Sequence, residues 1–198
     1  MREAIEMGSS YDIRFQPPAA VKALKEKMQP LMKQKDWAKA MEVADFRFYT
    51  GLEFPLGDQD YYLHYASAYG EELANRVCVC YVNYIEQLGK GALQDLDHAR
   101  SYYNNFINCL NYAEFLRKTF PENDSALNCL AYLTYMLVNE SGLTLFNAAK
   151  KIGEKSMEEK ANLLRRTSYT QTRDLHLELI NRHPEDLRAK QRLKKLTE

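Results

Sequence analysis

Glycine and proline are scarce in this sequence, which has eight glycines and six prolines among 198 residues. Long segments therefore contain no residue that breaks a helix. Within these segments apolar residues recur at spacings of three and four, and the alternation typical of strands is absent. The sequence predicts an all-α fold with about nine helices and no strand.

Net charge is also lacking, because 27 basic residues balance 27 acidic ones. A neutral chain has no overall field that attracts nucleic acid or an anionic membrane, so we expect neither as a partner. The N-terminus has no apolar run typical of a secretory signal, and no segment is apolar enough to span a bilayer. These absences predict a cytoplasmic protein. The charge is uneven, however: residues 150–198 hold 13 basic and 8 acidic residues and predict a local basic face.

Motifs of catalysis are missing as well. The sequence has no glycine-rich phosphate loop, nucleophile motif or zinc-hydrolase motif. Asp95 and His98 suit the first turn of a helix better than a catalytic pair. The four cysteines lie in apolar helical patterns and predict reduced core residues; they are Cys78, Cys80, Cys109 and Cys129. We therefore expect a protein that is not an enzyme and that needs no cofactor or metal.

The apolar pattern divides the chain into an arm and one domain. Residues 1–17 are predicted to form an irregular N-terminal arm, because consecutive prolines disfavour helix before them. Residues 18–198 are predicted to form a single helical domain that begins with a hairpin, in which Asp36 caps the second helix. Two long helices follow, over about 62–88 and 96–120, and the glycine turn between them favours antiparallel packing.

The last third is predicted to contain shorter helices. Residues 124–138 and 143–152 form two of them, and Ser156 begins the next. A further helix is expected to begin at Thr170 or Thr172. The chain then restarts after Pro184 into a basic terminal helix, with Leu187, Leu193 and Leu196 facing inward.

Spacing and side-chain size indicate a repeat. Pro55, Pro121 and Pro184 are 66 and 63 residues apart, close to twice the roughly 34-residue unit of a tetratricopeptide repeat. A large residue, a large–small pair and another residue then recur at spacings of three. These sets are Tyr62, Tyr65, Ala66 and Tyr69, and later Leu127, Leu130, Ala131 and Thr134. This pattern resembles the tetratricopeptide repeat family over about half of the chain, and best in FPENDSALNCLAYLTYMLVNESGLTLFNAAKKI.

The resemblance implies antiparallel helical hairpins stacked as a right-handed superhelix, here with an elongated central hairpin. Such a fold implies a non-enzymatic adaptor or scaffold that binds an extended or helical protein segment, of acidic character, in a concave groove. The same register implies the residues that face this groove. They are Asn128, Tyr132, Tyr135, Lys155, Asn162, Arg165, Arg188, Gln191 and Lys195.

Alternatives stand beside each of these interpretations. The fold could be an irregular helical bundle, and the groove residues are also typical of a solvated helix face. Val79 and Val82 face away from the main apolar stripe, which is expected if the central hairpin is the interface of an oligomeric assembly or if neighbouring helices bury it. Finally, Arg165, Arg166 and Ser168 fit a basic-directed kinase pattern, which predicts phosphorylation or simply an exposed helix end.

Overall fold

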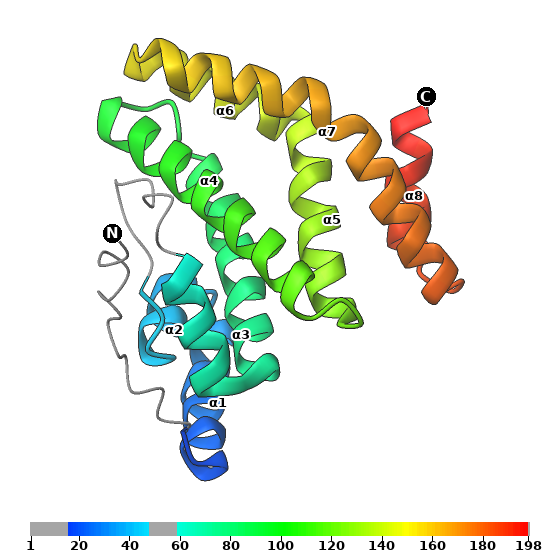
Figure 1. The fold of residues 1–198 in the computed structure, drawn as a ribbon. Coiled ribbons are helices and arrows are strands. Elements are labelled where there is room, and N and C mark those ends of the chain that lie inside the picture. The colour runs from blue at the N-terminus through cyan, green and yellow to red at the C-terminus, as the bar shows by residue number, and fades with distance from the viewer. Residues whose placement is uncertain (1–15, 48–58, 198) are drawn as a thin grey trace, which may run out of the picture.

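The structure, a computed structural model, describes residues 16–47 and 59–197 (Figure 1). The N-terminal arm predicted for residues 1–17 lies outside these residues except for Gln16 and Pro17. The described residues form eight α-helices and no strand, which confirms the all-α prediction. The helices are α1 (Pro18–Lys33), α2 (Trp37–Val43), α3 (Gln59–Gly89), α4 (Leu96–Thr119), α5 (Asp124–Val138), α6 (Glu140–Ile152), α7 (Lys155–Arg182) and α8 (Leu187–Thr197). None of them is both long enough and apolar enough to cross a bilayer.

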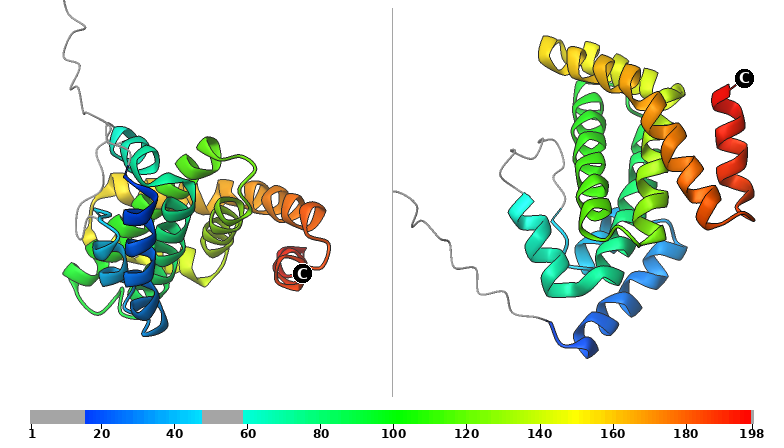
Figure 2. Two further views of the ribbon diagram at one scale, coloured as in Figure 1. Left: turned by 90° about the horizontal axis from the view of Figure 1, so that it is seen from below. Right: turned by 45° about the vertical axis from the view of Figure 1, so that its right-hand side comes forward.

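Contacts between the helices follow their order along the chain. Each helix contacts the next one, and further contacts join α1 to α3, α3 to α5, α4 to α6 and α5 to α7. The first part of α7 lies beside α6 at one end of the molecule, and α8 lies beside the last part of α7 (Figure 2). Neighbours in sequence are therefore neighbours in space, as in a stack built from successive helices.

The predicted central hairpin is present as α3 and α4, which pack against each other. Asp95 caps α4, because its carboxylate accepts a hydrogen bond from the backbone N–H of His98 at 2.8 Å. α3 differs from the prediction of an unbroken helix. It bends at Gly70, where φ is 80° and the backbone is not helical. Glycine adopts this left-handed conformation without the steric cost that a side chain would bring.

An aromatic cluster forms the centre of the core. The ring of Phe46 lies 5.1 Å from that of Tyr65 and 4.8 Å from that of Tyr112, so the segment after α2 is packed against α3 and α4. Two of the buried tyrosines donate their hydroxyl groups to backbone carbonyls: Tyr65 to Ala44 at 2.7 Å and Tyr112 to Ala74 at 3.0 Å. These bonds satisfy the hydroxyl groups that burial removes from water.

The four cysteines are buried and reduced, as the apolar pattern predicts. Burial raises the pKa of the Cys80 thiol to about 12, so the reactive thiolate is disfavoured at neutral pH. Val82 is also buried, with 5 % exposure, and Val79 is half-buried. Packing within the chain therefore accounts for both valines.

The prediction of a new helix at Thr170 or Thr172 is wrong. α7 is a single helix of 28 residues, and no glycine or proline interrupts it. Ser168 consequently lies in the middle of this helix with 2 % exposure. The kinase pattern that ends at Ser168 thus marks a buried position, and the expectation of an exposed helix end is wrong.

α7 also fixes how the last helices meet α5. Asp124 at the start of α5 accepts a hydrogen bond at 3.3 Å from Arg182 at the end of α7. Nearer the other end of α5, the ring of Tyr135 lies 5.9 Å from that of His176. The last part of α7 therefore runs antiparallel to α5. One helix therefore takes the place of the two that the sequence predicts over this segment.

The turn from α5 to α6 provides a test of this packing. A Cβ atom on Gly142 would lie 1.9 Å from the carbonyl oxygen of Leu137. We expect Gly142→Ala to lower the free energy of unfolding by about 2 kcal/mol, because the backbone must shift. Helix propensity alone would give the opposite sign, a gain of about 1 kcal/mol. Urea unfolding distinguishes the two, with Ser141→Ala as the neighbouring control, and a stabilised Gly142→Ala chain would contradict this packing.

Candidate functional site

Two of the residues predicted to face the groove from α5 lie side by side. Tyr132 and Tyr135 are both half-buried, and their rings are stacked with centroids 6.5 Å apart and an angle of 18° between the planes. Asn128 lies one turn earlier on the same helix and is exposed. The sequence thus correctly places an aromatic pair outside the main packing line of α5.

α8 partly covers this face, and it does so with a residue that was not predicted. The guanidinium carbon of Arg192 lies 4.2 Å from the centre of the Tyr132 ring and 5.9 Å from that of Tyr135. A cation in this position is attracted by the negative face of an aromatic ring. The predicted residues of this helix are instead exposed to solvent; they are Arg188, Gln191 and Lys195.

The packing of Ala189 determines which face of α8 is buried. Ala189 is 1 % exposed and packs with Leu127, Ala131 and Leu179, where a small side chain lets α8 approach α5 and α7 closely. Leu187, which was predicted to face inward, is 68 % exposed. Packing around Ala189 turns the helix so that Arg192 faces the tyrosines.

Besides its contact with Arg192, Tyr132 lines an open groove of about 630 Å³. Its hydroxyl donates to the carboxylate of Glu86 on α3. Burial, together with this carboxylate, raises the pKa of Tyr132 to about 12. The groove is formed by the segment before α2 and by α2 to α6. Its lining residues are Lys35, Trp37, Asn83, Ile85, Glu86, Gln87, Gly89, Lys90, Tyr102, Tyr132, Met136, Glu140, Ser141 and Thr144.

The groove combines aromatic surface with charges of both signs. Trp37 and Tyr132 are its half-buried aromatic side chains, while Lys35 and Lys90 are balanced by Glu86 and Glu140. Such a surface offers apolar contact and polar orientation together. Reasoning from the sequence missed Trp37 because it lies on an apolar stripe, where packing is the simpler explanation.

The remaining predicted residues lie elsewhere. Lys155 is exposed at the start of α7. Asn162 and Arg165 line a separate pocket of about 290 Å³ at the end of α5. Of the nine predicted residues, Tyr132 thus lines the groove, and Asn162 and Arg165 line the second pocket. That all nine face one concave surface stays a prediction.

His176 lies beneath the contact between α5 and α8 and is completely buried. Its Nδ1 atom is 2.8 Å from the carbonyl oxygen of Thr172, and Nε2 has no hydrogen-bond partner among the described residues. Burial is the main cause that lowers the pKa of His176; the positive charge of Arg192 lowers it further, while the Thr172 carbonyl and Asp186 oppose this. The structure therefore favours the neutral imidazole.

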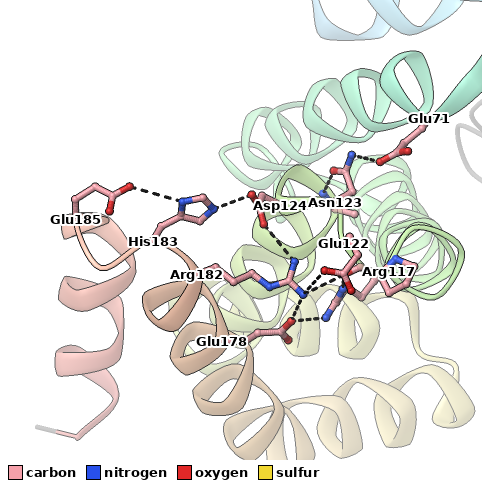
Figure 3. Close-up of polar contacts among 11 residues, drawn as sticks. Glu71, Arg117, Glu122, Asn123, Asp124, Glu178, Arg182, His183 and Glu185 are labelled. Atoms are coloured by element: carbon pink, nitrogen blue, oxygen red, sulfur yellow. Dashed lines mark hydrogen bonds and ion pairs between the residues drawn. The ribbon is translucent and has the colours of Figure 1, made fainter.

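A polar cluster joins the end of α7 to the start of α5 (Figure 3). Glu178 accepts hydrogen bonds from Arg117 of α4 at 2.6 Å and from Arg182 at 2.7 Å. His183 Nε2 lies 2.7 Å from a carboxylate oxygen of Asp124. The hydrogen bond to Asp124 is the main cause that raises the pKa of His183, and the same bond lowers the pKa of Asp124.

Comparison with family models finds no match, and neither do comparisons with curated proteins and with solved structures. Within the described part of the chain, no group of three or more His, Cys, Asp or Glu side chains is placed to hold a metal ion. The features that define the site are thus the groove, the tyrosine pair and the helix that covers this pair.

The two histidines near α8 predict opposite effects of pH on stability. The lowered pKa of His176 means that the unfolded chain binds a proton first as the pH falls through about 6.5, which destabilises the fold. The raised pKa of His183 means that its contribution is present below about 6.5 and is lost as the pH rises through its folded pKa. Acidification from about pH 7.5 to about pH 5.5 should therefore destabilise His176→Phe less than the wild type, and His183→Gln more. Urea midpoints at both pH values measure this, and equal pH dependence in all three chains would contradict it.

The contact of Arg192 with the tyrosines predicts how firmly α8 is held. We expect Arg192→Ala to reduce the protection of the α8 backbone amides by about 1 kcal/mol, because the cation–π contact is lost. Lys195→Ala, at an exposed position on the same helix, should leave this protection unchanged. Hydrogen exchange gives the comparison, with the amides of α4 as an internal reference. An equal loss of protection in both variants would show that the tyrosine contact does not hold α8.

Proposed function

We propose that this protein is a non-enzymatic adaptor or scaffold that binds a segment of a partner protein in the groove beside Tyr132. The observation that carries the proposal is the open groove of about 630 Å³, to which α2 to α6 all contribute residues. A surface formed by several packed helices is already shaped before binding, which lowers the entropic cost of ordering the complex.

The composition of the groove favours a peptide as its ligand. Trp37 and Tyr132, both half-buried, provide aromatic surface of the kind that anchors partner side chains. The two lysines and two glutamates can pair with either sign of charge on a peptide. A protein segment carries apolar and charged side chains together and so matches this mixture.

The order of the helices supports the same proposal. Contacts with the next helix and the next but one are those of stacked helical hairpins, whose inner surfaces bind extended segments. We extend the proposal to a tetratricopeptide-like arrangement of α1 to α6, with the elongated hairpin of α3 and α4 at its centre. Four buried reduced cysteines support action in a reducing compartment such as the cytoplasm.

Filling the groove tests the proposal. Thr144 lines the groove, and its hydroxyl donates to the carbonyl of Glu140 at 3.1 Å. Peptides are first selected on the immobilised wild-type chain from a random display library. We expect Thr144→Arg to weaken the selected peptides by about tenfold or more, because a long charged side chain occupies the site. Fluorescence anisotropy gives the dissociation constants.

Thr119→Arg is the matched control. Thr119 also lies on a helix, is exposed, and donates to the carbonyl four residues earlier, that of Phe115, at 2.8 Å. It lies in a different helix, α4, and does not line the groove. Its variant should bind as the wild type does. The proposal fails if the library yields no binding peptide, or if both arginine variants bind equally well.

A further inference from the structure

A second pocket lies between α7 and the last turn of α5 and has a volume of about 290 Å³. Four of its residues come from one face of α7, at relative positions i, i+3, i+4 and i+7. They are Asn162, Arg165, Arg166 and Tyr169. Leu137 and Val138 of α5 form the rest of its lining. The pocket therefore joins two guanidinium groups, an amide and a phenol, and contains no acidic side chain.

The positive charge of this pocket is not neutralised within the described part of the chain. Arg165 lies 5.9 Å from the centre of the Phe146 ring, which holds it in place without neutralising its charge. Neither Arg165 nor Arg166 takes part in an ion pair among the described residues. Along α7 the nearest acidic residues are Glu159 and Asp174, and Asp174 is paired with Arg173 at 2.9 Å.

α8 adds further positive charge at the edge of the pocket. The hydroxyl of Tyr169 donates to the carbonyl of Leu196 at 2.9 Å, so the end of α8 lies beside the pocket. Residues 187–197 contain five basic residues and no acidic one. The pocket is thus part of the basic face that the uneven charge of residues 150–198 predicts.

The partial negative charge at the end of α5 does not neutralise the two arginines. Carbonyl groups in the last turn of a helix carry about half a negative charge in total. Arg165 and Arg166 carry two full positive charges, so a net positive charge of about one and a half remains. An anionic group is therefore the complement that the pocket lacks.

We infer that this pocket binds an acidic group, a carboxylate or a phosphate, on the partner segment that the groove holds. The inference rests on the proposed function and adds the chemistry of the partner. Guanidinium groups form paired hydrogen bonds with both kinds of anion. Both sites border the last turn of α5, where Met136 lines the groove and Leu137 and Val138 line the pocket. We expect a partner segment that passes over this turn to reach both.

The experiment uses the full chain and three labelled probes of equal length: an oligoglutamate peptide, a peptide with phosphoserines spaced by glycine, and an oligolysine peptide. We expect both acidic probes to bind and the oligolysine peptide not to bind. Arg165→Gln with Arg166→Gln should weaken the acidic probes by at least about tenfold, because charge-assisted hydrogen bonds are lost. A stronger loss for the phosphoserine probe identifies phosphate as the preferred anion, and a stronger loss for oligoglutamate identifies carboxylate.

The control removes the same charge elsewhere. Lys22→Gln with Lys27→Gln changes two exposed residues of α1 and should alter binding less than about twofold. Equal losses in both double variants would overturn the inference, because the probes would then respond to net charge alone. Binding to anionic phosphatidylserine vesicles without binding to the acidic peptides would also overturn it.

Thr144→Arg separates the two proposals. Loss of the groove-selected peptides in this variant tests the groove, whereas loss of the acidic probes in Arg165→Gln with Arg166→Gln tests the pocket. The groove-selected peptides could lose affinity in Thr144→Arg while the acidic probes bind equally well to the wild type and to Arg165→Gln with Arg166→Gln. In that case the groove proposal stands and the pocket inference fails.

Discussion

Helix α7 runs for 28 residues without a glycine or proline, and it contacts α5, α6 and α8. This continuity sets the geometry of the C-terminal half. It brings Arg182 to the start of α5 and His176 to the Tyr135 ring. It also aligns Asn162, Arg165, Arg166 and Tyr169 on one face beside the end of α5. A turn near Thr170 would separate these contacts, so both the covered tyrosine pair and the basic pocket depend on one uninterrupted helix.

Tyr132 connects the two parts of the candidate site. Its hydroxyl donates to Glu86 at the edge of the groove, and its ring lies under Arg192 of α8. The side chain of Tyr132 is half-buried between α3 and α8. A tyrosine suits this position, since the ring provides an aromatic face and the hydroxyl provides a polar end. Phenylalanine would keep the contact with Arg192 and lose the link to α3.

Much of the helical architecture can be predicted from the sequence, because the period of apolar residues reports directly on which face is buried. The central hairpin, the buried cysteines and the aromatic pair Tyr132 and Tyr135 are all found this way. The register of α8 could not be predicted, because Ala189 is a weaker apolar signal than the exposed Leu187. The groove could not be predicted either. Its residues come from distant segments, and Trp37 and Tyr132 line the same groove only through tertiary packing.

Tyr132 contacts Glu86 in the groove and Arg192 of α8, so under the proposed function a ligand in the groove would lie one side chain away from the contact with α8. A ligand cation that pairs with Glu86 competes with the Tyr132 hydroxyl and alters the ring on which Arg192 rests. Linkage is reciprocal, so whatever holds α8 in place changes the affinity of the groove by the same factor. A ligand that alters the contact between Tyr132 and Arg192 would therefore be linked to the docking of α8, while one that leaves this contact unchanged would not.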